Sequence, residues 1–314
     1  MAGESDRFHA GPVRRAYPSV KISQESNDRY SATDALTGCR YGRPSLWQGA
    51  RAAATVVHVK IATWNVNSIR TRLPRLTAWL ERRRPDVVCL QEIKVTDDLF
   101  PRAELQALGY RALVAGQQTY NGVAILTRGE AREVARRLPD DDDDAQRRLL
   151  VAEVGGLTIV NVYGPNGQEV GSEKYAYKLD WYRRLRAFLE AGASPAEPVV
   201  LCGDLNIAPE DRDVWDPEKW RGQIMFSDPE RAVFRDLVGW GLRDSLRLHR
   251  EEGGLFTWWD YRAVAFHRGW GLRIDHILLA PAVAACCTAV EIDRDERKGA
   301  KPSDHAPVVA TLAD

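Results

Sequence analysis

The chain contains only five cysteines among its 314 residues, and their arrangement excludes two common uses of this residue. No C-x-x-C pair is matched by a second pair that would complete a zinc site, and an odd number does not fit a fully paired disulfide framework. We therefore interpret most of them as small core residues. They are Cys39, Cys89, Cys202, Cys286 and Cys287.

The chain also lacks an excess of one charge and a long apolar run. Basic and acidic residues each number 44, so the formal net charge is zero, which excludes a globally basic nucleic-acid binder but leaves room for a local basic face. No run approaches the roughly 20 apolar residues of a membrane span, and the N-terminus lacks the pattern of a signal peptide. We expect a soluble, cytoplasmic protein with no membrane partner.

The first 57 residues show no sustained helical or strand periodicity. Their mixture of Ser, Gly, Pro, Arg and Asp predicts a disordered N-terminal extension, and their acidic residues disfavour a transit peptide. An alternative hypothesis is that the true start lies near Val59 and the tail is an upstream extension of the reading frame. Residues 58–314 contain enough apolar sequence for one domain.

Short β-rich runs and a few helical patterns alternate after Val59. A helix is predicted after the first strand, with Pro74 near its start and Leu73, Leu76, Trp79 and Leu80 on one face, and further helices are predicted around Tyr175 to Leu189 and near Pro229 to Trp240. Pairs of strands separated by short turns indicate α/β layers with mixed or antiparallel sheets rather than repeating βαβ units. The predicted strands cover residues 60–65, 86–92, 110–115, 122–127, 148–154, 157–163, 198–206, 255–260, 272–280 and 305–312.

Polar side chains gather where these predicted strands begin or end. One such residue is ordinary capping, but six strand ends together are hard to explain in that way. Carboxylate and amide oxygens suit a hard cation such as Mg²⁺, and a magnesium ion beside Asp and His fits phosphodiester hydrolysis. The residues are Asn65, Asn67, Glu92, Tyr163, Asn166, Asp204, Asn206, Asp275, Asp304 and His305.

The acidic run at residues 140–144 is a weaker metal candidate. Contiguous acidic residues point in alternate directions and lack the spaced ligands and the glycine of an EF-hand loop. We interpret the run as a solvated loop.

Several motifs together resemble the exonuclease III family of the endonuclease/exonuclease/phosphatase superfamily, and they fall in the family's order over nearly everything after Val59. GDLN and SDH are shared by the whole superfamily, whereas NVNSIR, TWWDYR and LRID are typical of its DNA-directed members. The motifs are TWNVNSIR (63–70), LQEIK (90–94), YNGVAIL (120–126), NVYGPNG (161–167), GDLNIAP (203–209), TWWDYR (257–262), GLRIDHILLA (271–280) and KPSDHAPV (301–308).

The resemblance implies a four-layer αββα sandwich with two mixed β-sheets and a monomeric, Mg²⁺-dependent DNA repair nuclease, with Mn²⁺ as the alternative ion. Its partner would be double-stranded DNA with abasic sites or 3′ ends, cleaved by endonuclease and 3′ to 5′ exonuclease action. Sphingomyelinases and inositol-phosphate phosphatases share GDLN and SDH, so a phosphatase for a lipid or inositol phosphate is the first alternative. A non-catalytic nucleic-acid-binding regulator on the same fold is the second.

Carried over by motif, Glu92 would be the principal metal ligand, with Asn67 close by and Asn65 fixing the cluster. Turn formation is the alternative role for the two asparagines. Asp204 would orient or deprotonate the attacking water, or else protonate the leaving group. Asn206 would hold the phosphate or the water, and Tyr163 would stand near the phosphate.

Adjacent side chains on extended backbone point to opposite faces, so Asp304 and His305 are poorly placed to bond each other. We predict that His305 pairs with Asp275 instead, and that Asp304 belongs to the metal neighbourhood. Trp258, with Leu272, would wall a small pocket that accepts a base-free sugar. The alternative is that Trp258 belongs to the core. The positions that resemble DNA-backbone contacts are Arg70, Lys94, Tyr120 and Asn166.

Overall fold

The computed structural model describes residues 58–141 and 145–313, which all lie in one compact unit. The predicted N-terminal extension, residues 1–57, and the middle of the acidic run, residues 142–144, lie outside the described residues. In the described part of the chain, no helix is both long and apolar enough to cross a membrane.

Two mixed six-stranded sheets form the centre of this unit. In each, one pair of neighbouring strands is parallel, β1 with β2 and β7 with β8, and the other pairs are antiparallel. The first sheet has the order β11 (Cys287–Ile292), β12 (Val308–Leu312), β1 (Val59–Asn65), β2 (Val87–Gln91), β4 (Val123–Thr127) and β3 (Arg111–Ala115). The second has the order β5 (Ala131–Ala135), β6 (Leu149–Val154), β7 (Leu157–Tyr163), β8 (Val199–Asp204), β10 (Asp275–Leu279) and β9 (Arg243–Asp244).

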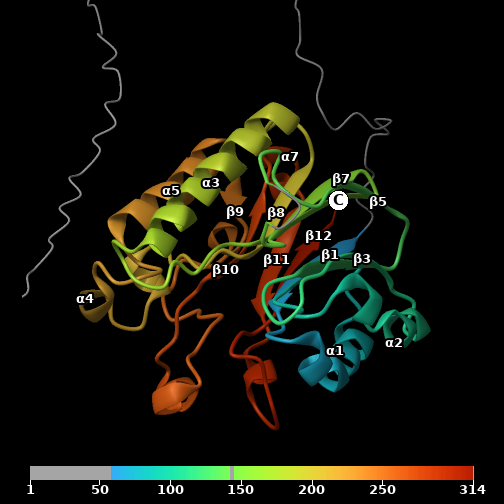
Figure 1. Ribbon diagram of the computed structural model, residues 1–314, viewed down its shortest axis with the longest axis horizontal. Coiled ribbons are helices and arrows are strands. Elements are labelled where there is room, and N and C mark those ends of the chain that lie inside the picture. The colour runs from blue at the N-terminus through green and yellow to red at the C-terminus, as the bar shows by residue number, and fades with distance from the viewer. Residues whose placement is uncertain (1–57, 142–144, 314) are drawn as a thin grey trace, which may run out of the picture. The chain divides into compact units, whose positions relative to one another are not determined.

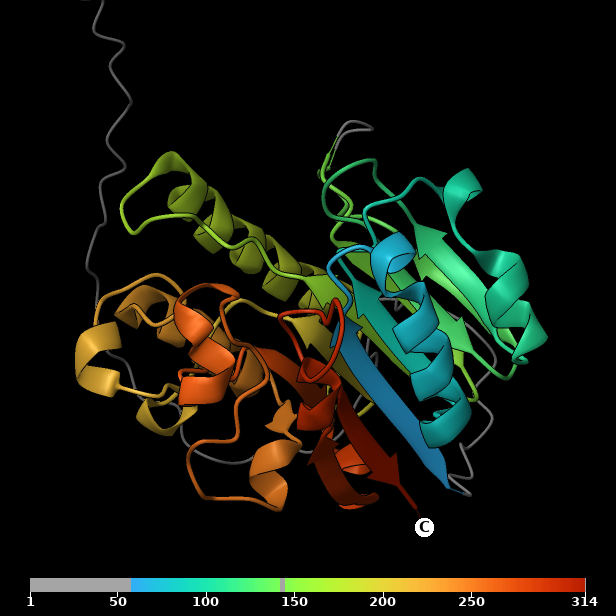
Figure 2. The same cartoon turned by 90° about the horizontal axis from the view of Figure 1, so that it is seen from below.

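Helices cover the outer faces of both sheets. Figure 1 shows α3 and α5 on one side of the sheets and α1 and α2 on the other, and Figure 2 shows α1 alongside β1. The predicted four-layer αββα arrangement is therefore confirmed. The helices are α1 (Ile69–Arg83), α2 (Arg102–Ala107), α3 (Glu173–Gly192), α4 (Pro217–Trp220), α5 (Asp228–Gly239), α6 (Ala265–Arg268) and α7 (Pro281–Ala285).

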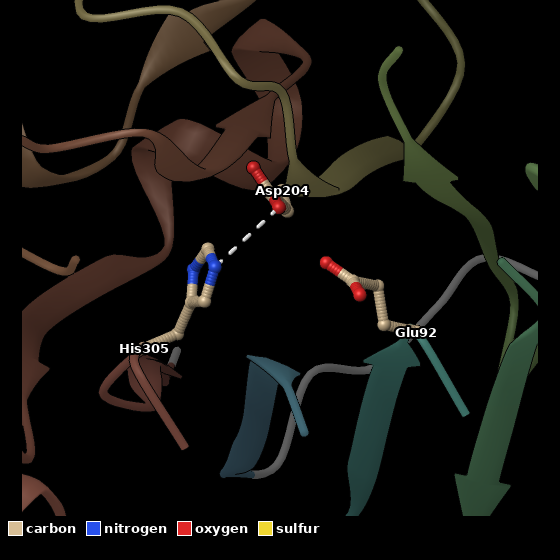
Figure 3. Close-up of side chains that lie close together, drawn as sticks. All are labelled: Glu92, Asp204 and His305. Carbon is tan, nitrogen blue, oxygen red and sulfur yellow. Dashed lines mark ion pairs between the residues drawn. The ribbon is translucent and has the colours of Figure 1, made fainter. Parts of the chain in front are cut away.

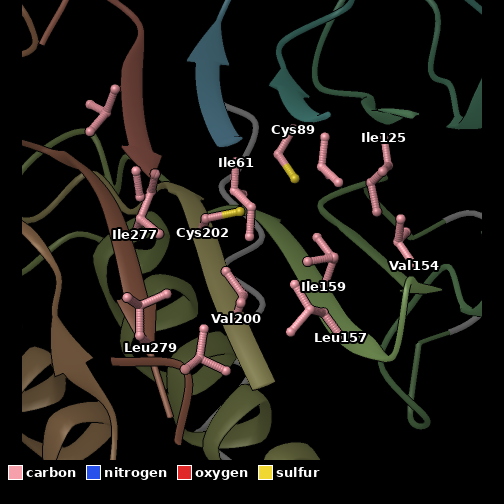
Figure 4. Close-up of a cluster of buried hydrophobic side chains, with 14 of the residues drawn as sticks. Ile61, Cys89, Ile125, Val154, Leu157, Ile159, Val200, Cys202, Ile277 and Leu279 are labelled. Carbon is pink, nitrogen blue, oxygen red and sulfur yellow. The ribbon is translucent and has the colours of Figure 1, made fainter. Parts of the chain in front are cut away.

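The central strands alternate between two apolar layers because successive side chains of a strand point to opposite faces. In β8, Val200 and Cys202 lie in the core between the two sheets, whereas Val199 and Leu201 pack against the helix layer with Trp181. Figure 4 shows the inter-sheet core, in which side chains from β1, β2 and β4 meet those from β7, β8 and β10. Burial on both faces explains why these strands read as continuous apolar runs.

The sheet topology places many strand ends at one edge. Strands β1 and β2 are parallel, as are β7 and β8, so the carboxyl ends of each pair finish together. Strands β10 and β12 run antiparallel to β8 and β1 and begin at the same edges, with Asp275 opposite Asp204 and Val308 opposite Thr63. Polar residues far apart in the sequence are thus brought to one rim.

Three sequence expectations about the elements were wrong. Residues 255–260 do not form a strand, because their backbone bonds to two different partners: Trp258 N–H donates to Leu272 O at 2.9 Å and Trp259 N–H to Asp304 O at 3.0 Å. The segment therefore crosses between the sheets instead of extending one of them. The predicted strand at 272–280 begins only at Asp275, and the one at 305–312 only at Val308.

Candidate active site

Glu92, Asp204 and His305 converge at the shared rim (Figure 3). Glu92 follows β2, Asp204 ends β8, and His305 precedes β12. Each offers a ligand atom, and these atoms lie within 4.8 Å of one another. The distance from His305 Nε2 to Asp204 Oδ2 is 3.7 Å. Two carboxylates and an imidazole from three separate segments therefore share one small volume.

Asn65, at the end of β1, holds the two carboxylates together. Its fully buried side chain donates from Nδ2 to Glu92 Oε1 at 2.9 Å and to Asp204 Oδ2 at 2.8 Å. The Tyr163 hydroxyl donates to the same Glu92 oxygen at 2.9 Å. Asn65 thus joins a carboxylate of the first sheet to one of the second, which is a larger role than turn formation.

The predicted pairing of His305 with Asp275 is confirmed. His305 Nδ1 lies 2.9 Å and 3.1 Å from the two Asp275 carboxylate oxygens, and both side chains are buried. The Asp304 carboxylate instead accepts hydrogen bonds from Asn67 Nδ2 at 2.9 Å and from Trp258 Nε1 at 3.1 Å. Adjacent residues in the sequence therefore serve different parts of the site.

Asn206 sits beside Asp204 in a fixed orientation. Its backbone N–H donates to Asp204 Oδ1 at 2.9 Å, and its side chain donates to Gly164 O at 3.0 Å. Asn166 Nδ2 in turn donates to Asn206 Oδ1 at 3.2 Å. Gly203 is required just before Asp204, because a Cβ there would lie 1.8 Å from the Val162 carbonyl oxygen.

Four residues of the site have a positive φ, which is uncommon without glycine. The angles are 43° at Asn67, 48° at Glu92, 55° at Lys94 and 50° at Asn206. Asparagine tolerates this region, whereas glutamate and lysine adopt it at an energetic cost. Such conformations cluster at functional sites, where the surrounding structure enforces them.

Local charge keeps two of the carboxyl groups ionised despite their burial. Burial would raise the pKa of Glu92, but the Lys94 ammonium, 2.8 Å from Glu92 Oε2, and the bond from Asn65 hold that pKa below its usual value. For Asp304, burial is likewise outweighed by the charge of His305 and by the bonds from Asn67 and Trp258, so its pKa is lowered. Both groups are therefore carboxylates at neutral pH.

The groups at the centre of the cluster are shifted in the opposite direction. Burial raises the pKa of Asp204 to about 7, and the nearby Asp275 carboxylate adds to this against the charge of His305. Burial alone would lower the pKa of His305, but the Asp275 and Asp204 carboxylates raise it to about 10. Burial and the charges of Glu92 and Asp204 raise the pKa of Tyr163, so its phenol remains a proton donor.

The donor set fits a hard divalent cation. Glu92, Asp204 and Asp304 offer carboxylate oxygens, and the ligand atoms of Glu92, Asp204 and His305 lie within 4.8 Å of one another. Asn67 adds an amide oxygen beside Glu92, where Lys94 Nζ also reaches it at 2.5 Å. Oxygen donors of this kind favour Mg²⁺ or Mn²⁺ over zinc.

The remaining predicted residues lie around this cluster at different depths. Trp258 is half-buried against Asp304, and Leu272 is completely buried behind it, joined to Trp258 by backbone hydrogen bonds. Arg70 and Tyr120 are exposed, and within residues 58–141 and 145–313 neither side chain hydrogen-bonds to the cluster. The Lys94 ammonium lies within the cluster, 2.8 Å from Glu92 Oε2.

Two buried hydroxyl groups of the site were missed by sequence reasoning. Ser303 Oγ donates to Asn65 O at 2.7 Å and accepts from the backbone N–H of His305 at 3.2 Å. Thr257 Oγ1 accepts from the backbone N–H groups of Ile274 and Asp275, each at 3.1 Å. Both precede a predicted site residue within a quoted motif, which is a signal that could have identified them.

Comparison with known proteins gives consistent matches. A profile described as the Endonuclease/Exonuclease/phosphatase family matches residues 62–305. Exodeoxyribonuclease III of Haemophilus influenzae is 39% identical over 264 residues, which cover 80% of this chain and 99% of that protein.

Solved structures agree with these sequence matches. A variant of the 3′ phosphatase NExo from Neisseria, bound to a product DNA hairpin, is 45% identical, with a TM-score of 0.78 over 82% of this chain and 100% of that one. An AP endonuclease from Archaeoglobus fulgidus is 38% identical, with a TM-score of 0.78 over 81% of this chain and 99% of the other.

Proposed function

The chain belongs to the endonuclease/exonuclease/phosphatase family, and we propose that it cleaves duplex DNA at abasic sites and at 3′ ends with the help of Mg²⁺. It is a DNA repair nuclease of the exodeoxyribonuclease III type, a phosphodiester hydrolase. We assign the activity to residues 58–314 acting as a monomer, because a single chain supplies every member of the cluster.

One observation carries the proposal more than any other. Asn65 joins the carboxylates of Glu92 and Asp204, which come from different sheets, and the ligand atoms of Glu92, Asp204 and His305 lie within 4.8 Å of one another. Hydrolysis of a phosphodiester requires charge neutralisation, a proton acceptor and a fixed phosphate in one place. The cluster contains candidates for each task.

The residues divide these tasks between them. Asp204, fixed by Asn65 and by the backbone of Asn206, orients the attacking water and takes its proton. His305, held by Asp275, is positively charged and binds a phosphate oxygen. Tyr163 keeps its proton and would turn it from Glu92 Oε1 to the reacting phosphate. Asn206 holds the phosphate beside Asp204.

Glu92 would be the principal ligand of Mg²⁺, with Asn67 and Asp304 nearby. When bound, the ion supplies positive charge that neutralises the phosphate in the transition state. Mn²⁺ has the same preference for oxygen ligands and would replace it.

Residues around the cluster would bind the sugar and the backbone of the DNA substrate. Trp258, supported from behind by the buried Leu272, forms the wall against which a base-free sugar packs. The proposed contacts to the DNA backbone are Arg70, Lys94, Tyr120 and Asn166.

A panel of matched duplexes tests the activity. We expect Mg²⁺-dependent cleavage of an abasic duplex and of a nicked duplex, with no turnover of an inositol phosphate. Addition of EDTA should lower each DNA rate by roughly a hundredfold or more, and excess Mg²⁺ should restore it. Turnover of the inositol phosphate alone would contradict a DNA substrate.

Salt tests the contacts to the phosphate backbone. We expect the logarithm of the affinity for duplex DNA to fall linearly with the logarithm of salt concentration, by about 0.9 for each phosphate neutralised. Arg70→Ala should reduce this slope by about one phosphate if the exposed guanidinium contacts the backbone. Fluorescence anisotropy between 50 and 200 mM salt measures both slopes, and an affinity that does not change with salt contradicts DNA as the partner.

A further inference from the structure

Lys178 is completely buried beneath two loops of the active site. It lies on α3, and its ammonium group contacts three acceptors: Asn166 O at 3.1 Å, Asn206 O at 2.8 Å, and Glu230 Oε1. An ammonium group has three donor hydrogens, so every donor is used. Two of its three partners are backbone carbonyls of residues that we place at the phosphate.

Glu230, on α5, fixes the position of this ammonium group. Its Oε1 also accepts from Met225 N–H at 3.0 Å, and its Oε2 accepts from the N–H and the hydroxyl of Ser227 at 3.0 Å and 2.6 Å. Both the lysine and the glutamate side chains are fully inaccessible to solvent. The lysine is therefore held in place by α5, a helix that carries none of the residues of the cluster.

The two loops rest directly on this lysine. A Cβ at Gly167 would lie 3.0 Å from the Lys178 Cδ atom, so the loop that carries Asn166 packs against the lysine stem. In the other loop, Asn206 has a φ of 50° and is bonded through its backbone N–H to Asp204. The side chains of Asn166 and Asn206 also bond to each other and so join the two loops.

A lysine is costly at this position, because its charge is completely removed from water. The neighbouring buried residues on the same face of α3 are Tyr175, Trp181, Tyr182 and Leu185. A buried ion pair stabilises a fold no better, on average, than well-packed apolar side chains of the same volume. Stability alone therefore does not explain a charged residue at this position, whereas its two carbonyl partners suggest a role in the site.

We propose that Lys178 is a positioning residue for catalysis: by binding the carbonyl groups of Asn166 and Asn206, it sets the place of the Asn206 side chain relative to Asp204. This inference rests on the proposed nuclease function. The lysine touches neither DNA nor the reacting atoms and acts only through Asn206. Its loss should consequently reduce turnover more than binding.

Lys178→Met tests this role, because methionine keeps the apolar stem and removes the donors. We expect kcat on the abasic duplex to fall by roughly tenfold to a hundredfold, as displacements near 1 Å do in other sites, with KM changed less than threefold. Lys174→Met, an exposed lysine on the same helix, is the matched control and should retain wild-type kcat. Wild-type kcat in a folded Lys178→Met variant would overturn the proposal.

A double-mutant cycle separates positioning from general damage. In an Asn206→Ala background, Lys178→Met should cost less than twofold in kcat, because the group through which it acts is already gone. A full loss in that background would mean that Lys178 acts elsewhere and would overturn the assignment. Hydrogen exchange should also accelerate at the Asn206 amide in Lys178→Met, and unchanged exchange there would contradict the mechanism.

A second variant shows whether misfolding, rather than loss of positioning, explains the lower kcat of Lys178→Met. Lys178→Met/Glu230→Gln removes both buried charges and keeps one oxygen acceptor, for the backbone N–H of Ser227, and it should show the same loss of kcat. Failure of the proposed function is distinguishable, since the wild-type protein would then leave the abasic duplex uncut.

Discussion

Asp204→Asn should lower the single-turnover rate of cleavage by about 10³-fold or more while leaving the fold intact. The amide has the shape of the carboxylate and can still accept the hydrogen bond from the Asn206 backbone. It cannot take a proton from water, and it cannot carry the negative charge that faces His305 across 3.7 Å. Rapid-quench measurements at saturating Mg²⁺ give this rate, and circular dichroism checks the fold.

A surface replacement of the same kind is the control for this variant. Asp180→Asn changes an exposed aspartate of α3 that pairs with Arg183 and should leave the rate unchanged. A rate near that of the wild type in Asp204→Asn would exclude Asp204 from the proton transfer.

The same variant also distinguishes the two roles open to Asp204. A substrate with a bridging sulfur at the leaving group needs no proton to depart. If Asp204 deprotonates water, the sulfur substrate should remain slow in Asp204→Asn. If Asp204 instead protonates the leaving oxygen, the sulfur substrate should recover most of the rate.

The strands that the sequence predicted well are those buried on both faces. Their apolar runs are continuous, as in β2 and β8, and each ends at a clear polar residue. Elements without such a pattern were missed. Helix α2 has six residues, of which only Leu105 is buried, and β11, at the border of its sheet, buries only Cys287 and Val290. Short or half-exposed elements are stabilised by contacts with neighbouring elements, and a local sequence pattern does not reveal those contacts.

The site was predictable in part because strand direction carries information about position. Polar residues at strand ends were expected to meet, and Glu92, Asp204 and His305 do so. Contacts between elements that are distant in the sequence were harder to predict. Nothing in the run around Lys178 distinguishes it from an exposed lysine, except its helical spacing with Trp181 and Leu185. That spacing places it on the apolar face and was a usable signal.

Asp275→Asn should have the second large effect, a loss of about 10²-fold to 10⁴-fold in the cleavage rate. The carboxylate accepts from His305 Nδ1 at 2.9 Å and thereby fixes both the ring orientation and its positive charge. An asparagine can turn its NH₂ group toward Nδ1, which favours the neutral ring with the proton on Nε2. In a hydrolase triad, replacing the aspartate by its amide lowers kcat about 10⁴-fold, because the histidine adopts the wrong tautomer.

The coupling between Asp275 and His305 can be measured directly. His305→Ala should cost at least as much as Asp275→Asn, and the double variant should be no slower than His305→Ala alone, because groups that act as a unit are not additive. Nitrogen-15 NMR of the imidazole should show His305 protonated at both nitrogens in the wild type at pH 7 and neutral in Asp275→Asn. The direction follows from the carboxylates, which raise the pKa of His305 and so keep it charged. Additive losses would assign Asp275 a task separate from holding the imidazole.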